Sequence, residues 1–213
     1  MTSTQPATNN DPRNTLIRAI VQHEWNQFQN TNNEGGRAAC QGNWPTFNQM
    51  RSSQFLTWPL PLLESYLNDL DKADQTGRNL ITEKYGRMMA STAPADYRAN
   101  IEPYIPKLSE ERIALQERII AQQVTWAADF RHHWPKLGRA MRVLTTAEDS
   151  DAATSFETYL RGELGTYSAH TLALYGQWIE ELAAQHRNLT EETIDNTVRL
   201  GGFDNLAEAE AAQ

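Results

Sequence analysis

Glutamate and arginine side chains fall on the apolar faces of helices in this sequence, where their chemistry would be sheltered from water. Glu24 lies within an apolar stripe, one helical turn from both Ile20 and Phe28. Arg51 and Gln54 occupy a similar stripe further along the chain. A carboxylate in such a place is costly unless it is paired, protonated or bound to a ligand. Because a guanidinium can bind a carboxylate through two hydrogen bonds, we expect Glu24 to be buried and paired with Arg51.

Polar groups on inner helix faces could serve in two ways. They could line an open pocket for a small molecule that carries an amine, a carboxylate or both, or they could close into an ion-pair network that only fixes helix register. An apolar environment can prepare a glutamate to act as a general base, and Glu24 and Glu83 are the candidates for that catalytic role. The residues predicted to bind the ligand are Arg37, Gln41, Arg51, Gln54, Glu157, Arg161 and Tyr167.

The elements that must position these side chains are helices. Asp11-Pro12 predicts the start of a first helix, which should run to about residue 30. Pro45 begins a second helix, and Ser109 caps a long helix that ends before Pro135. The remaining apolar periodicities predict further helices over residues 62–72, 78–92 and 190–200.

The stretch 154–182 contains no proline and predicts one long helix at the centre of the bundle, near residues 155–185. Thr154 and Glu157 match a capping box at its start. Besides an aromatic and aliphatic face, this helix has a stripe of small residues, namely Gly162, Gly165, Ala169, Ala173 and Gly176. Glycine within a helix costs about 1 kcal/mol relative to alanine, so the stripe predicts close approach by another backbone. We expect that partner to be the helix over residues 109–134.

Composition and patterning predict a single all-α domain. The chain has 213 residues with 39% hydrophobic and 22% charged side chains, and no period-two strand pattern is present in the sequence. We expect a bundle of about six to eight helices over residues 11–206. A disordered leader over residues 1–10 should precede it, and an acidic tail over residues 207–213 should follow it.

Charge and apolar content argue against two classes of partner. The net charge is -8, so the basic surface of a nucleic-acid-binding protein is not expected. No apolar run approaches the roughly 20 residues that a membrane-spanning helix needs. Cys40 is the single cysteine and the first residues do not resemble a signal peptide, which favours the cytoplasm. The sequence assigns no cofactor and no oligomeric state.

Two other classes of function compete with small-molecule binding. Glu24, Glu83, Glu157 and His170 could be recruited to a carboxylate-bridged metal site, as in some helical bundles. The Glu-x-x-His spacing that such sites use is absent from the sequence, so we predict no metal ligands. The acidic tail or the small-residue stripe could instead serve a non-enzymatic protein-interaction module. Whether the protein is an enzyme is therefore left open.

Six segments of the chain are distinctive when taken together. They are EW at 24–25, GGRAACQ at 35–41, TFNQMR at 46–51, QFLTW at 54–58, GRNLITEKYGRMM at 77–89 and ETYLRGELGTYS at 157–168. These segments resemble the bacterial domain of unknown function 4125, and the resemblance extends from about Leu16 to Leu206. It implies a cytoplasmic bacterial domain, and it carries over no reaction, cofactor or catalytic residue.

Overall fold

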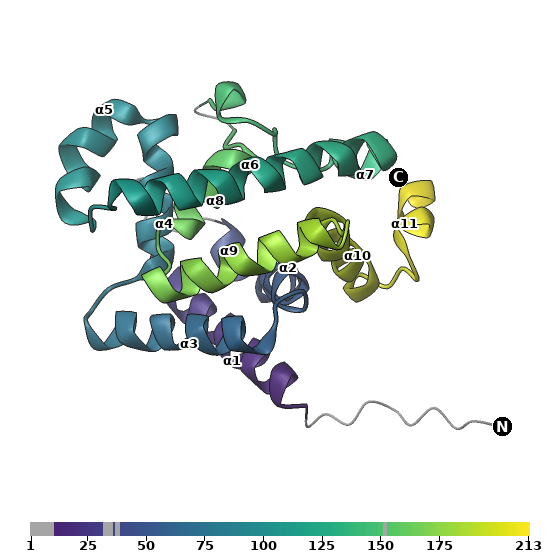
Figure 1. Cartoon of the computed structure of the whole chain (residues 1–213), viewed down its shortest axis with the longest axis horizontal. Helices are drawn as coiled ribbons and strands as arrows, with labels where there is room; N and C mark the ends of the chain where they lie inside the picture. Colours follow the sequence, from purple (N-terminus) through teal and green to yellow (C-terminus); the bar gives the residue numbers. More distant parts are fainter. Residues whose placement is uncertain (1–10, 32–35, 37–38, 151–152) are drawn as a thin grey trace.

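The computed structural model describes residues 11–31, 36, 39–150 and 153–213, and these form helices joined by turns (Figure 1). The helices are α1 (Pro12–Gln29), α2 (Trp44–Phe55), α3 (Leu60–Gln75), α4 (Leu80–Thr92), α5 (Pro94–Asp96), α6 (Glu110–His133), α7 (Pro135–Arg139), α8 (Phe156–Leu164), α9 (Ala169–Ala184), α10 (Leu189–Leu200) and α11 (Leu206–Ala212). The all-α class is confirmed. The described ranges contain eleven α-helices rather than six to eight, because several of them are short.

Side-chain caps begin α1 and α6 at the residues that the sequence indicated. The Asp11 side chain accepts a hydrogen bond from the backbone N–H of Arg13, and Pro12 is the first residue of α1. Ser109 accepts from the N–H of Arg112 and starts α6. Each cap satisfies a backbone donor that the helix itself leaves without a partner.

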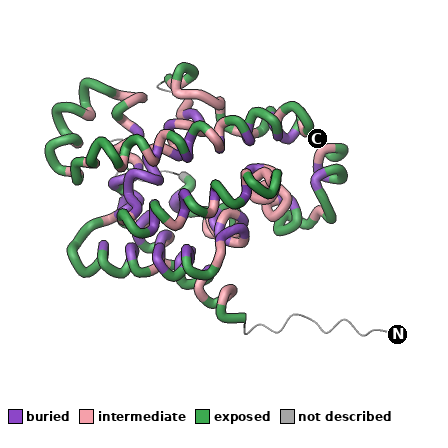
Figure 2. Tube along the Cα trace, viewed as in Figure 1, coloured by how far each residue is buried: buried purple, intermediate pink, exposed green. Residues whose placement is uncertain are grey.

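Three helices, α6, α9 and α3, run side by side across the molecule, with α9 packed against both of the others (Figure 1). The buried residues concentrate where these helices meet α1, α2, α4 and α8 (Figure 2). At the centre, the rings of Trp58, Tyr66, Tyr167 and Tyr175 contact one another, with centroids 5.2–6.0 Å apart. A smaller apolar cluster joins α6 and α7 to α10 and α11.

The long central helix predicted over 155–185 is two helices, so that prediction was wrong. α8 ends at Leu164 and α9 begins at Ala169. The Ser168 side chain caps α9 by accepting from the N–H of Thr171. The backbone N–H of Ser168 donates to Asp69 of α3 at 2.8 Å, which fixes the turn. A serine at the N-cap favours a helix start, although the apolar pattern continues across the turn.

Because of this break, the residues of the small-residue stripe face different parts of the structure. At Gly162, a Cβ atom would lie 2.8 Å from the backbone oxygen of Lys84, so α8 approaches α4 closely there. Gly165 faces the side chain of Arg87, also on α4. Gly176 alone faces α6, and Ala169 and Ala173 are exposed. Close helix approach is therefore confirmed at Gly162, whereas α6 is the wrong partner for most of the stripe.

The last residues are helical and packed against the domain. Within α11, Ala209 is fully buried in the smaller apolar cluster. The Glu210 carboxylate accepts hydrogen bonds from the backbone N–H groups of Lys136 and Leu137, each at 2.9 Å. Glu210, which lies in the acidic tail expected over residues 207–213, therefore caps α7. The predicted leader over residues 1–10 lies outside the described residues.

Candidate functional site

A group of charged side chains lies inside the helical bundle, and Glu24 and Arg51 are its first pair. Arg51 Nε donates to Glu24 Oε2 and Arg51 Nη2 donates to Glu24 Oε1, both at 2.6 Å. The hydroxyl of Tyr66 donates to Glu24 Oε1 at 2.8 Å. Glu24 is 0% exposed. The predicted bidentate pair is confirmed.

A second buried carboxylate, Glu163 of α8, extends this group to α4. Lys84 Nζ donates to Glu163 Oε2 at 2.6 Å, and Arg51 lies 3.3 Å from Glu163 Oε1. Gln54 and Tyr167 donate to the same Oε1 atom at 2.9 and 3.1 Å. Sequence reasoning placed Arg51, Gln54 and Tyr167 in a site but missed both Glu163 and Lys84.

The interior network, which we define as Glu24, Arg51, Gln54, Lys84, Glu163 and the hydroxyls of Tyr66 and Tyr167, balances its charges. Burial raises the pKa of Glu163, but the positive charges of Arg51 and Lys84 outweigh this effect and hold that pKa far below its usual value. Burial lowers the pKa of Lys84, and the charge of Glu163 more than restores it. The four charged side chains are at most 9% exposed. Of the two arrangements left open by the sequence, the structure has the closed network at these residues.

A pocket of about 690 Å³ lies beside Glu83. It is formed between the start of α4 and the segment of residues 93–109 that leads to α6, which we call the crossover. One wall is made by Gly77, Arg78, Asn79, Thr82, Glu83 and Gly86, and the other by Asn100, Ile101, Pro103, Tyr104, Ile105 and Pro106. We call it the Arg78 pocket. Its volume falls within the range typical of small-molecule sites. Its walls combine charged groups from α4 with apolar side chains from the crossover.

The charged residues that line this pocket are one arginine, Arg78, and one carboxylate, Glu83. Arg78 Nη2 donates to Glu83 Oε2 at 2.6 Å, and Arg87 Nη2 donates to Glu83 Oε1 at 2.8 Å. Burial lowers the pKa of Arg112, and the positive charges of Arg87 and Arg78 add to this effect, while the carboxylates of Glu83 and Asp69 partly oppose it. Two guanidinium groups therefore share the carboxylate of Glu83, and their local positive charge favours binding of an additional anion.

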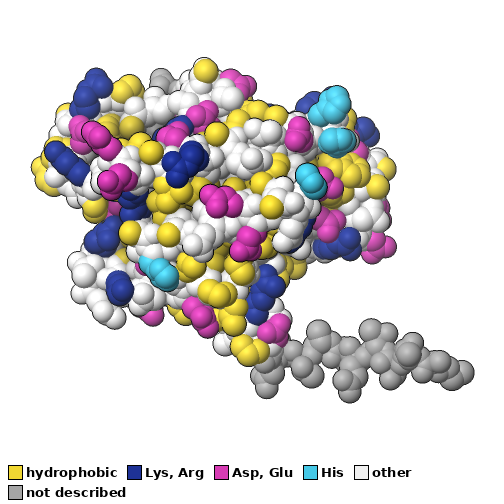
Figure 3. Space-filling view, in the orientation of Figure 1, with side chains coloured by type: hydrophobic (Ala, Val, Ile, Leu, Met, Phe, Trp, Pro, Cys, Tyr) yellow, Lys and Arg dark blue, Asp and Glu magenta, His cyan; other side chains and the backbone are white. Residues whose placement is uncertain are grey.

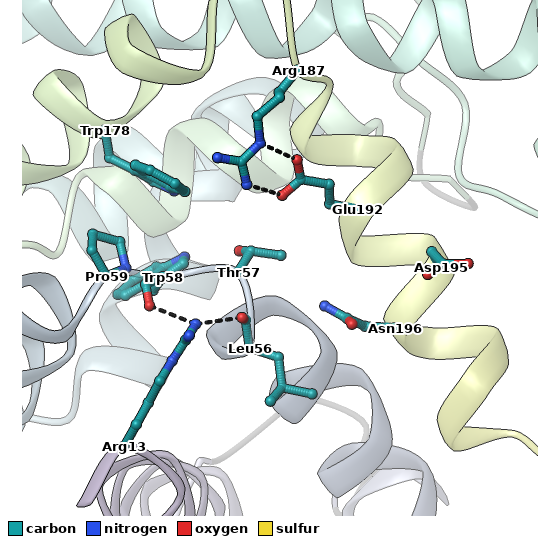
Figure 4. A pocket seen from close by; sticks show the side chains of 10 residues that line it. All are labelled: Arg13, Leu56, Thr57, Trp58, Pro59, Trp178, Arg187, Glu192, Asp195 and Asn196. Carbon is teal, nitrogen blue, oxygen red and sulfur yellow. Dashed lines mark hydrogen bonds and ion pairs between the residues drawn. The ribbon is translucent and has the colours of Figure 1, made fainter. Parts of the chain in front are cut away.

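A second pocket, of about 460 Å³, lies where the turn between α2 and α3 meets α9 and α10 (Figure 4). Its walls are formed by Arg13, Leu56, Thr57, Trp58, Pro59, Trp178, Arg187, Glu192, Asp195 and Asn196. Two indole rings lie on one side, and the ion pair of Arg187 with Glu192 lies on another (Figure 4). We call it the Trp178 pocket.

Comparison with known proteins gives one match. The model of the family described as a protein of unknown function, DUF4125, matches residues 14–211. The chain belongs to the DUF4125 family. No curated protein and no solved structure matches the chain. Five of the six segments on which the sequence resemblance rests contribute side chains to the interior network of this DUF4125 protein, as Glu24, Arg51, Gln54, Lys84 and Glu163 show.

Two of the predicted ligand-binding residues form a separate cluster at the surface. Arg161 binds Glu117 of α6 through two hydrogen bonds of 2.7 and 2.8 Å, and it also binds Glu157 at 2.7 Å. The expected capping box at Glu157 was wrong, because Ser155 caps α8 by accepting from the N–H of Thr158. Glu157 instead accepts from the backbone N–H of Thr146 at 2.8 Å.

Gln41 is also placed apart from the interior network. The amide nitrogen of Gln41 donates to the carbonyl oxygens of Phe28 and Thr31, at 2.7 and 2.9 Å, and so holds the end of α1. Arg37 lies outside the described residues. The ligand-binding roles predicted for Gln41, Arg37, Glu157 and Arg161 stay predictions.

The carboxylates that we considered for a metal site lie in different parts of this DUF4125 protein. Glu24 pairs with Arg51, Glu83 with two other arginines, and Glu157 with Arg161, while His170 is exposed. In the part of the chain that the structure describes, no three metal-binding side chains gather. No helix among the described residues is long and apolar enough to span a membrane.

Proposed function

We propose that this DUF4125 protein binds a small molecule that carries a carboxylate and an apolar group, and that the Arg78 pocket holds it. The partly exposed guanidinium of Arg78, in a pocket that also has apolar walls, carries this proposal. Arg78 and Arg87 share the single carboxylate of Glu83, so this group of three side chains carries a net positive charge. On a chain of net charge -8, such a local positive excess favours an anionic ligand group.

Arg78 is the proposed anchor for the carboxylate. Its side chain is 44% exposed, and among the described residues only its Nη2 atom has a hydrogen-bond partner. A guanidinium presents five N–H donors in one plane, so Nη1 and the second N–H of Nη2 can together bind a carboxylate bidentately. Glu83 is then a positioning residue, because its carboxylate holds the guanidinium of Arg78 in place.

The crossover supplies the apolar part of the proposed site. Ile101, Pro103 and Ile105 line the pocket, and Tyr104 is 83% exposed at its edge. The crossover packs directly on α4, because a Cβ atom at Gly86 would lie 2.9 Å from Ile101 Cγ2. An apolar ligand group could therefore be covered on one side while its carboxylate reaches Arg78.

The proposal concerns binding and gives no catalytic role to Glu24 or Glu83, which we predicted earlier as candidate general bases. Both oxygens of Glu83 are held by guanidinium groups, and both oxygens of Glu24 are held within the interior network. Catalysis by Glu24 or Glu83 stays a prediction. We place the activity in the bacterial cytoplasm, which the single cysteine, Cys40, supports.

Calorimetric titration with two matched probes tests the proposal. The carboxylate 3-phenylpropionate and its neutral amide have the same ring and chain, so they differ in charge at the position that Arg78 would bind. Hydrogen bonds to charged groups contribute about 1.5–3 kcal/mol, so we expect the carboxylate to bind at least about tenfold more tightly than the amide.

Variants localise the effect. Arg78→Gln should abolish the preference for the carboxylate, because it removes the charge from a partly exposed position. Arg118→Gln is the matched control, since Arg118 is exposed on α6 and bonds only its own helix. Equal binding of the acid and the amide, or an unchanged preference in Arg78→Gln, would overturn the proposal.

A further inference from the structure

The Trp178 pocket collects hydrogen-bond donors that have no acceptor. Among the described residues, seven buried side-chain nitrogen or oxygen atoms have no hydrogen-bond partner. Three of these seven belong to residues that line this one pocket: Arg13 Nε, Trp58 Nε1 and Trp178 Nε1. All three atoms are N–H donors. Buried polar groups are normally paired, so this concentration points to an acceptor that a bound molecule would bring.

The charged groups of the pocket already have protein partners. Arg187 binds Glu192 through hydrogen bonds of 2.6 and 2.8 Å, and Asp195 accepts from Arg199 Nε at 2.6 Å. Arg13 Nη2 donates to the backbone oxygen of Trp58 at 2.8 Å. The two cations and two anions that line the pocket, which are Arg13, Arg187, Glu192 and Asp195, cancel in charge. Because these four charges cancel and each group already has a partner, the pocket has no net charge to attract a charged ligand, which favours an uncharged one.

The rings of Trp58 and Trp178 indicate the shape of a molecule that would fit this pocket. Trp58 and Trp178 lie on the same side of the pocket (Figure 4), and the guanidinium of Arg187 covers the Trp178 ring at 5.2 Å from its centroid. Trp58 is 0% exposed and its ring contacts those of four residues, including a perpendicular contact with Phe55 at 4.9 Å; the others are Tyr66, Tyr167 and Tyr175. Its N–H group is therefore fixed in direction, as a specific hydrogen bond requires.

We infer that the Trp178 pocket binds a flat, uncharged heterocycle whose carbonyl oxygens accept hydrogen bonds from Trp58, Trp178 and Arg13. A volume of about 460 Å³ accommodates a molecule of one or two rings. This site does not depend on the proposed function, because the two pockets share no lining residue. Binding at one pocket can be lost without loss at the other.

Nuclear magnetic resonance of the indole groups tests the inference directly. The chain has six tryptophans, and each gives one indole N–H signal in a nitrogen-labelled sample. Uracil and nicotinamide are the probes, since both are flat, uncharged heterocycles that carry a carbonyl oxygen. Indole is the matched control probe, because it is flat but has no carbonyl oxygen. We expect uracil or nicotinamide at millimolar concentration to shift the Trp58 and Trp178 signals selectively, and indole to leave them in place.

Two variants complete the test. Trp178→Phe keeps an aromatic ring at a half-buried position and removes the N–H group, so it should weaken probe binding about three- to tenfold, as loss of one hydrogen bond predicts. Trp44→Phe is the control, since Trp44 is half-buried in another aromatic cluster. Arg78→Gln should leave this binding unchanged. If neither probe shifts the two signals, the donors are satisfied by water and the inference is wrong; equal binding in Trp178→Phe would also contradict it.

Discussion

Lys84 contacts α8 through both its backbone and its side chain. Its ammonium donates to Glu163 at 2.6 Å, and its backbone oxygen lies where a Cβ atom on Gly162 would come within 2.8 Å. The two contacts involve consecutive residues of α8. Because Gly162 has no side chain, α4 and α8 can approach closely. This approach brings the buried ammonium of Lys84 to the carboxylate of Glu163. The ion pair and the glycine therefore belong to one packing arrangement.

Removal of the Glu163 charge should destabilise the fold. Glu163→Gln would leave Lys84 buried without a carboxylate, and loss of one partner from a buried pair costs about 3–5 kcal/mol. Chemical denaturation would measure this change in the free energy of unfolding. Glu117→Gln is the control, because Glu117 pairs with Arg161 while 42% exposed, and such pairs contribute about 1 kcal/mol or less. Similar losses in the two variants would contradict a special role for Glu163.

The same carboxylate should make stability depend on pH in the acid range. Attraction by Arg51 and Lys84 outweighs burial and depresses the pKa of Glu163 in the folded state, whereas an unfolded glutamate titrates near about 4.3. Above that pH, Glu163 is ionised in both states and its full contribution to stability is present. As the pH falls below about 4.3, the unfolded state takes up a proton first, so stability is lost.

Denaturation curves at successive pH values would measure this dependence. We expect the free energy of unfolding to fall more steeply below about pH 4.3 in the wild-type protein than in Glu163→Gln. Equal slopes in the two proteins would show that other carboxylates cause the acid sensitivity.

Close packing of α8 on α4 predicts intolerance of even one methyl group at Gly162. In Gly162→Ala, the new Cβ would meet the Lys84 backbone oxygen at 2.8 Å, and backbone atoms cannot move aside as a flexible side chain can. We expect a loss of about 1–3 kcal/mol in the free energy of unfolding. At Gly42, no atom lies within 4 Å of a Cβ, so Gly42→Ala should be close to neutral. A neutral Gly162→Ala variant would refute close contact between the helices.

The sequence was sufficient to predict the pair of Glu24 and Arg51, because both interrupt apolar stripes with complementary charges. The same signal was present elsewhere: Glu163 lies one turn from Leu160 and Tyr167, and Lys84 lies one turn from Ile81 and Met88. These residues could have been found by the rule that identified Glu24. The helix break at Ser168 was hidden for a different reason, since an N-cap serine inside an apolar pattern is compatible with continuous helix as well as with a new start.

The pockets depend on tertiary packing that local patterns do not specify. The Arg78 pocket forms because the proline-rich crossover folds back onto Gly86 of α4, and nothing in the sequence sets that direction. The Trp178 pocket joins Arg13 to Trp178, which are far apart along the chain. The space-filling view shows charged and apolar side chains interspersed over one face, so composition alone does not mark a site there (Figure 3).

A crystal structure of the protein with 3-phenylpropionate tests the central claim most directly, because it locates the ligand. We predict electron density for the carboxylate against the guanidinium of Arg78, with the phenyl ring on Ile101 and Pro103 of the crossover. A crystal of Arg78→Gln soaked in the same way should show no ligand there. Density for the probe at another place, or an occupied pocket in the Arg78→Gln crystal, would contradict the account.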